Sequence, residues 1–314
     1  MSFPLNFLPP LLAAVDSSAG ADNLTDAQLI ARYPAIAVTG AVLLFLGLIC
    51  NLYLLVRFTR RPNPNQGLTE KPLLKIEPQS WGMNELMFAI IALILIWTAV
   101  DGTVLLALKL AHMDVDDDRV MPWLLVTEMV IRISILLSFV GFFRWRRVDW
   151  RRALGLRGIS SAISMGFGTV CFFAILPPLA ITFVAYSQFC QLVGIKEKAQ
   201  DIADLLAGSD SMAVVVLIAA FAIMIAPVFE EFLFRGFAYP VLKQRWGTWR
   251  ALMAVSAVFA AIHFHLPSLG PLFTLGVGLG LAYELSGSLL APITMHALFN
   301  ATNVAMLLYV RAHP

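Results

Sequence analysis

The sequence predicts an all-α protein, a polytopic transmembrane helical bundle with about eight membrane-spanning helices. Apolar residues make up 59% of the 314 residues and charged residues only 13%, against roughly 45–50% and 25% in soluble globular domains. The apolar residues also gather in separate runs, each long enough to cross a hydrocarbon core of about 30 Å. A helical bundle in a bilayer accounts for both observations.

The predicted spans follow one another along the chain after an N-terminal tail, residues 1–34. In order, they are expected near residues 35–58, 83–110, 121–143, 163–187, 212–242, 250–265, 269–286 and 289–310. Residues 1–209 therefore hold the tail and about four helices without a recognisable motif. Residues 210–310 hold about four more helices, and these carry the polar motifs.

The distribution of lysine and arginine predicts the orientation. Loops 57–81, 144–157 and 243–250 carry five, six and three basic residues. The alternate segments 1–34, 111–120 and 188–211 carry only one, one and two. Because basic loops remain in the cytoplasm, we expect the N-terminus to lie outside. We expect the membrane to be a bacterial plasma membrane. With eight spans, the C-terminus would also lie outside.

Two adjacent carboxylates and an arginine interrupt the fifth predicted helix, in the stretch Ala226-Pro-Val-Phe-Glu-Glu-Phe-Leu-Phe-Arg-Gly236. Each charged residue at mid-membrane costs about 2.5–3.5 kcal/mol on insertion scales, so these groups must pair or face a polar interior. Glu231 and Arg235 are four residues apart, in the order that suits an ion pair. Glu230 lies about 100° round the helix and has no such partner.

Two further helices carry polar residues at helical spacing. Phe259 and His263 lie one turn apart near the end of one predicted helix, and His296 and Asn300 lie one turn apart in the last. Each pair alone is compatible with a structural role. Counted from the helix ends at 1.5 Å per residue, all three motifs fall between mid-membrane and the cytoplasmic face. We therefore expect them to converge on one cavity.

In this order, Glu-Glu-x-x-x-Arg followed by Gly, Phe-x-x-x-His and His-x-x-x-Asn resemble the signature of the CAAX-protease and bacteriocin-processing family. The resemblance is to the intramembrane proteases of that family, which includes prenyl-protein CAAX endopeptidases. The stretch from Gly280 to His296 is also similar to the family's link between its last two core helices. The resemblance covers roughly residues 210–305.

The resemblance implies a role for each motif residue. Glu230 with His263 would activate a water molecule for attack on a peptide carbonyl. His296 and Asn300 would donate hydrogen bonds to the oxyanion, while Glu231 and Arg235 position the helix. The substrate would be a membrane-embedded or lipid-modified protein or peptide, such as a prenylated CAAX-type protein.

The motif residues leave metal dependence open. Two histidines and a glutamate can form a His₂Glu zinc site with water as the fourth ligand. Glu230, His263 and His296 would be the ligands. The sequence has no His-Glu-x-x-His helix, and we favour the form without a cofactor, with zinc as the alternative.

Two other classes of function remain beside proteolysis. The buried carboxylates could serve a transporter as a proton or cation site, or the chain could be a non-catalytic immunity or scaffold protein. A transporter would be expected to show related halves, and a degenerate protease to have lost motif residues; neither is found. The net charge of +2 is too small to suggest nucleic acid, which leaves the substrate and membrane lipids as partners.

The remaining polar residues suggest structural roles. Asp101 is expected to be structural, and Glu128 with Arg132 can form an i,i+4 pair. The Arg/Trp run from Arg144 to Arg152 resembles an interfacial anchor that could contact anionic headgroups. Four glycines are expected to allow close helix packing or to end a helix: Gly276, Gly278, Gly280 and Gly287.

Overall fold

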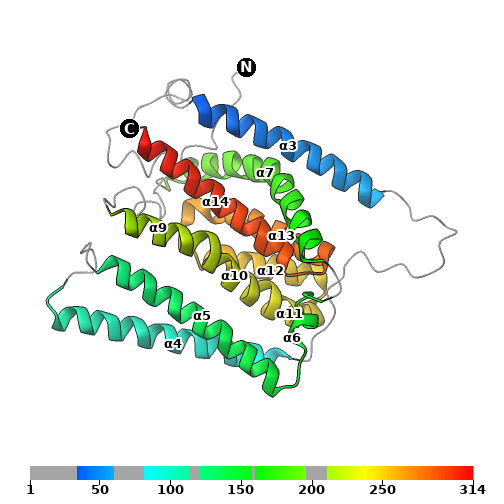
Figure 1. The fold of residues 1–314 in the computed structure, drawn as a ribbon. Helices are drawn as coiled ribbons and strands as arrows, with labels where there is room; N and C mark the ends of the chain where they lie inside the picture. Colours follow the sequence, from blue (N-terminus) through cyan, green and yellow to red (C-terminus); the bar gives the residue numbers. More distant parts are fainter. Residues whose placement is uncertain (1–33, 60–80, 114–119, 158–159, 196–210, 314) are drawn as a thin grey trace.

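A computed structural model describes residues 34–59, 81–113, 120–157, 160–195 and 211–313, and every regular element in these ranges is a helix (Figure 1). The helices are α3 (Pro34–Thr59), α4 (Met83–Leu110), α5 (Met121–Trp145), α6 (Trp150–Ala153), α7 (Ser161–Leu192), α9 (Met212–Ala220), α10 (Ala226–Glu231), α11 (Tyr239–Trp246), α12 (Thr248–Ala261), α13 (Leu269–Ser286) and α14 (Leu290–Ala312). The predicted tail up to residue 33, and most of the loop at 57–81, lie outside these ranges.

Seven helices in the described ranges are long and apolar enough to cross a membrane, with α9, α10 and α11 forming one of them. The all-α class and the multi-pass membrane character are therefore confirmed. The difference from the predicted eight spans lies at α12, which has 14 residues and measures only about 21 Å. Because α12 still runs antiparallel to α11 and α13, the start of α3 and the end of α14 lie at the same end of the bundle (Figure 1).

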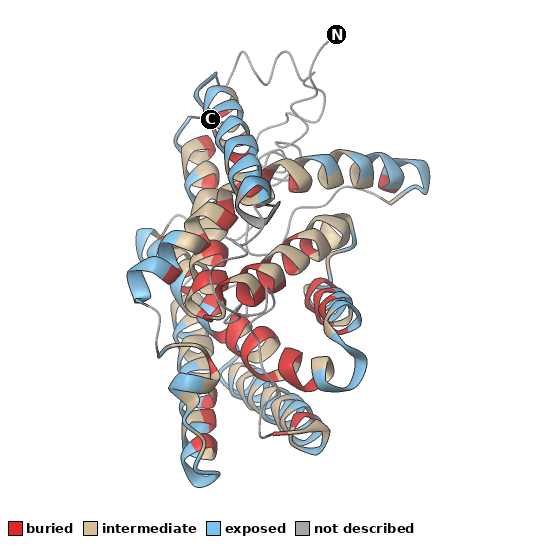
Figure 2. Cartoon of the chain, turned by 90° about the vertical axis from the view of Figure 1, so that its right-hand side faces the viewer, coloured by how far each residue is buried: buried red, intermediate tan, exposed pale blue. Residues whose placement is uncertain are grey.

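The inner helices supply most of the buried residues, whereas the outer ones expose apolar side chains (Figure 2). In α4 no residue of the most apolar window is buried, and Phe88 and Leu95 are 75% and 62% exposed. In a bilayer such surfaces contact lipid chains, which are as apolar as leucine. Asp101, also on α4, is exposed.

The helix α3 packs on a bend in α7. Pro177-Pro178 inside α7 removes two backbone donors and leaves the carbonyls of Phe173 and Ala174 without their helical partners. Nδ2 of Asn51 donates to the Ala174 carbonyl at 2.7 Å. A Cβ on Gly47 would lie 2.5 Å from the Phe173 carbonyl oxygen, so only glycine permits this approach. The helix α7 also packs against α13 and α14.

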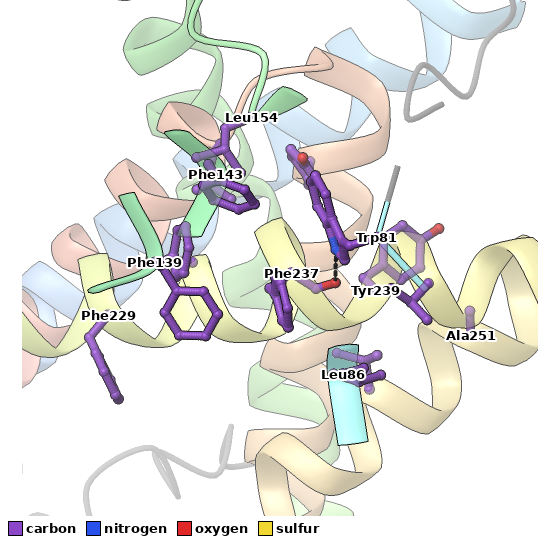
Figure 3. Packing of buried hydrophobic residues seen from close by; sticks show 14 of the residues in the cluster. Trp81, Leu86, Phe139, Phe143, Leu154, Phe229, Phe237, Tyr239 and Ala251 are labelled. Carbon is purple, nitrogen blue, oxygen red and sulfur yellow. Dashed lines mark hydrogen bonds between the residues drawn. The ribbon is translucent and has the colours of Figure 1, made fainter. Parts of the chain in front are cut away.

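Aromatic side chains join α4 and α5 to the central helix α10–α11 (Figure 3). Trp81 is buried just before α4, stacks on Phe237 at a centroid distance of 5.7 Å, and donates from Nε1 to the Phe237 carbonyl at 3.0 Å. The ring of Phe139 meets those of Phe232 and Phe237 edge-on, at 5.0 and 4.8 Å. These contacts place α5 directly beside the helix that carries the two glutamates.

Small residues bring α13 close to its neighbours, as predicted. A Cβ on Gly276 would lie 3.0 Å from the Cβ of Ser256, and one on Gly278 would lie 2.6 Å from the side chain of Ile175. Gly280 approaches α12 in the same way. Gly287 ends α13 with φ of 71° and donates its N–H to Tyr283 at 2.8 Å, which confirms the predicted C-cap.

Candidate functional site

The two glutamates lie at the irregular centre of the longest helix, which runs from Met212 to Trp246. Two π-helical turns, Phe221–Ile225 and Phe232–Ala238, enclose the short α-helical segment α10. A proline, which has no N–H to donate, follows each π turn, Pro227 in α10 and Pro240 in α11. Such π turns inside α-helices are frequent at functional sites.

Glu231 is fully buried and is the acceptor for two partners. Its Oε1 receives a hydrogen bond from Nη1 of Arg235 at 2.8 Å and one from Nδ1 of His296 at 2.9 Å. The i,i+4 ion pair expected from the spacing is therefore present. The contact with His296 joins α10 to α14 across 65 residues of sequence, and spacing alone did not predict it.

Arg235 extends the group to α12 and α13. Its Nη2 donates to the carbonyl of Gly276 at 3.0 Å, and its guanidinium centre lies 4.6 Å from the centroid of the Phe259 ring. The close approach of Gly276 to α12 leaves that carbonyl within reach. Sequence reasoning missed this acceptor, because a backbone carbonyl carries no residue signature.

Glu230 is the partly accessible carboxylate of the pair, with 19% of its side chain exposed. Its Oε2 is itself buried and has no hydrogen-bond partner among the described residues. That oxygen lies 3.9 Å from Nε2 of His296, too far for a direct hydrogen bond. An unpaired buried carboxylate oxygen facing an imidazole nitrogen is poised to share a proton with a small polar molecule.

His263 lies in the turn that follows α12. Its Nδ1 contacts the carbonyl of Phe259 at 2.7 Å, and because a carbonyl only accepts, Nδ1 carries a proton, which makes Nε2 the acceptor of the neutral ring. The Phe259 ring contacts both histidines edge-on, with its centroid 4.9 Å from that of His263 and 5.8 Å from that of His296. The motif Phe-x-x-x-His thus provides both the ring contact and the backbone bond that orient His263.

Asn300 takes a different partner from the other motif residues. Its Nδ2 donates to the carbonyl of Ala222 at 2.7 Å. Ala222 lies eight residues before Glu230, about 12 Å along the helix axis. The N–H of Ala226 bonds to Phe221 in the π turn, and Pro227 has no N–H. Because the Ala222 carbonyl is left without a helical donor, Asn300 supplies one. A second N–H of the amide remains for another acceptor.

The three proposed zinc ligands are not assembled as a set. In the described part of the chain, no group of three His, Cys, Asp or Glu side chains is arranged to hold a metal ion. Nδ1 of both His263 and His296 is engaged by an oxygen, so Nε2 is the nitrogen that each could offer. Two of the three proposed ligands, Glu230 and His296, do lie near each other, with 3.9 Å between Oε2 and Nε2.

Two other polar groups lie within the bundle. Glu284 on α13 is buried and accepts from Tyr239 Oη and Lys243 Nζ, both at 2.5 Å. No spacing rule predicted this cluster, since its members come from α11 and α13. Glu128 and Arg132 form the predicted i,i+4 ion pair on α5.

Comparisons with known proteins agree with this site. A model of the family described as type II CAAX prenyl endopeptidase, Rce1-like, matches residues 212–302. An uncharacterized 24.3 kDa protein of Escherichia coli is 35% identical over 89 residues, which are 27% of this chain and 40% of that protein. No solved structure matches the chain significantly. All three motifs lie in the matched segment, which confirms the resemblance drawn from them. Residues 212–302 of this chain are therefore similar to the Rce1-like type II CAAX prenyl endopeptidase family.

Proposed function

We propose that this protein is an intramembrane endopeptidase that hydrolyses a peptide bond with a water molecule activated by Glu230 and His263. The observation that carries the proposal is the Glu230 carboxylate, which is partly accessible and has a buried oxygen without a partner. Its neighbour Glu231 is fully buried, and its Oε1 is held by Arg235 and His296. Of two adjacent acids, one therefore holds the helices together and the other is available for chemistry.

The proposed reaction uses these two residues to activate water. A water molecule between Glu230 and His263 would give a proton to the carboxylate while its oxygen attacks the scissile carbonyl carbon. The carbonyl oxygen would then carry the negative charge of a tetrahedral intermediate. When the C–N bond breaks, the same proton would pass to the leaving amine. His263 is suited to hold the water, because Nδ1 donates to the Phe259 carbonyl and Nε2 is an acceptor.

His296 and Asn300 are the proposed donors to the oxyanion. Removing one such donor typically costs about 10²–10³ in rate. The bond from Nδ1 of His296 to Glu231 means that Nε2 donates only when it also carries a proton. Asn300 uses one N–H on the Ala222 carbonyl and would offer its second. Glu231 and Arg235 act as positioning residues for this arrangement.

The location of the site favours a substrate that reaches it through the membrane. At 1.5 Å per residue, Glu230 lies about 27 Å from the start of its helix at Met212 and about 24 Å from the end at Trp246. The substrate class we propose is accordingly a membrane-embedded or lipid-modified protein or peptide. A prenylated CAAX-type protein is one member of that class.

Zinc remains the alternative to the metal-free mechanism. If a metal ion binds, Glu230, His263 and His296 are the proposed ligands, through a carboxylate oxygen and the two Nε2 atoms, and the ion would supply Lewis-acid activation of water. Side-chain rearrangement would be required to bring the three together.

The charges at the bundle ends support the proposed orientation. The end formed by α6 and the α11–α12 turn exposes many arginines and three tryptophans, Trp145, Trp246 and Trp249, at 77%, 47% and 60%. Basic residues at this end include Arg144, Arg147, Arg151, Arg152, Arg245 and Arg250, all exposed. We propose that this end contacts anionic headgroups at the cytoplasmic face of a bacterial plasma membrane, with both chain termini outside.

The experiment that tests the function is a proteomic comparison of cells carrying the native chain and Glu230→Gln. Membrane peptides cut by this protein should accumulate uncut in the variant, and cleavage of a substrate found in this way should fall by about 10²–10⁴-fold, as for loss of a general base. The matched control is Asp101→Asn, the same chemical change at an exposed position on α4. Native turnover in purified, folded Glu230→Gln would refute the assignment of the base.

A further inference from the structure

Arg132, at the middle of α5, makes the most extensive set of aromatic contacts of any cation in the described ranges. Its guanidinium centre lies 4.7 Å from the ring centroid of Trp97 on α4. It lies 4.6 and 5.5 Å from the ring centroids of Phe221 and Phe229 on the central helix. Glu128, one turn earlier on α5, is its ion-pair partner. This residue is outside the segment that matches the family model, 212–302.

The two phenylalanines mark the ends of the irregular stretch that leads to the candidate base. Phe221 is the first residue of the π turn, and Phe229 directly precedes Glu230. Between them the π turn and Pro227 interrupt the regular hydrogen-bond ladder. A helix that has lost backbone hydrogen bonds needs other contacts to keep one conformation. Arg132 contacts this stretch at both of its ends.

The surroundings make these contacts strong. Phe221 and Phe229 are buried, at 9% and 4% exposure, and only 15% of the Arg132 side chain is exposed. A guanidinium in a desolvated site is attracted to aromatic faces more strongly than at a surface. Its planar shape also lets it lie against more than one ring, which a lysine ammonium cannot reproduce.

We propose that Arg132 is a positioning residue for the endopeptidase reaction: it clamps Phe221 and Phe229 and thereby holds the Glu230 carboxylate in its working position. The inference rests on the proposed function for its catalytic consequence, although the clamp itself is a statement about structure. Glu128 fixes the guanidinium from the α5 side. The segment before residue 210 then contributes directly to the geometry of the site.

The first test is Arg132→Lys, which keeps the charge and the pairing with Glu128 but loses the planar contacts. We expect kcat to fall by about ten- to a hundredfold, as for a small displacement of a catalytic group, with KM changed less than about twofold. Arg132→Leu should lose at least as much activity. The control is Arg146→Lys, whose native partner is Glu85 at 3.2 Å and which should leave both constants unchanged.

A second measurement does not depend on proteolysis. Hydrogen–deuterium exchange of the purified, detergent-solubilised chain should become faster in residues 221–231 of Arg132→Lys, with α13 and α14 unaffected. The increase in exchange in the double variant Arg132→Lys, Phe229→Leu should be smaller than the sum of the two single increases, because both changes remove the contact between Arg132 and Phe229. Additive effects of the two substitutions would overturn the clamp.

The outcomes separate this inference from the proposed function. Native kcat in folded Arg132→Lys, while Glu230→Gln is inactive, overturns the positioning role and leaves the endopeptidase proposal standing. Faster exchange in residues 221–231 in a chain without measurable proteolysis supports the clamp and counts against the proposed function. Unchanged exchange in Arg132→Lys overturns the clamp whatever the activity shows.

Discussion

The Glu231→Gln substitution gives the sharpest test of the division of labour between the two adjacent acids. Oε1 of Glu231 accepts from Arg235 and His296 at 2.8 and 2.9 Å, and the carboxylate is fully buried. Hydrogen bonds to a charged group contribute about 1.5–3 kcal/mol each, against about 0.5–1.5 kcal/mol for neutral ones. Weakening both bonds should therefore lower the free energy of unfolding by roughly 2–3 kcal/mol. The guanidinium left without a counter-charge brings the expected loss to about 3–5 kcal/mol, the range for a broken buried pair.

The assay is reversible unfolding of the purified protein in mixed micelles, followed by tryptophan fluorescence as the fraction of denaturing detergent increases. Glu230→Gln is the matched control, since it makes the same chemical change one residue away at an oxygen without a partner. We expect its unfolding free energy to stay within about 0.5 kcal/mol of the native value. Removing both charges, with Glu231→Leu and Arg235→Met together, should recover most of the stability, because apolar replacements of buried pairs are often neutral.

Two results would contradict these roles: Glu231→Gln unfolding at the native midpoint, or Glu230→Gln being the more destabilised of the two. Either result would mean that the structural and reactive roles are exchanged. A double replacement less stable than Glu231→Gln alone would show that the pair contributes net stability, beyond avoiding an unpaired charge.

Three further predictions concern topology, metal and packing. Labelling in intact cells should find a tag in residues 62–74 on the cytoplasmic side and one in 114–118 outside, both beyond the described ranges; the reverse pattern would invert the proposed orientation. Elemental analysis of active, purified protein should find no stoichiometric zinc, and chelators should leave cleavage intact; one zinc per chain, with activity lost on stripping and restored on return, would make both histidines metal ligands. Gly155→Ala should lower the free energy of unfolding more than Gly194→Ala does, by at least about 2 kcal/mol. Both glycines have positive φ, 67° and 76°, but only a Cβ at Gly155 meets backbone, 1.8 Å from the Gly287 carbonyl; equal melting of the two variants would contradict the clash.

The sequence by itself determined the fold class and most helix positions, because a bilayer requires long apolar runs with internally satisfied backbone groups. Seven of the eight predicted windows correspond to helices of spanning length. The exception, near 250–265, contains apolar residues up to and beyond the point where α12 ends at Ala261. Hydropathy does not register where a backbone turns, and here the turn carries His263.

Local pairs were also predictable from the sequence. The ion pairs of Glu231 with Arg235, and of Glu128 with Arg132, follow from i,i+4 geometry on a helix. The order of three short motifs was sufficient to indicate the family whose model matches residues 212–302. These features depend only on spacing along the chain, which the sequence states directly.

Tertiary structure decided which groups share partners. His296 reaches Glu231 rather than standing free, and Asn300 bonds to a carbonyl that a π turn and Pro227 release. Arg132 lies against Phe221 and Phe229, although α5 carries no motif. Each of these contacts joins residues far apart in sequence through backbone irregularities and side-chain directions. A one-dimensional pattern does not contain them, because they arise only when the helices have packed.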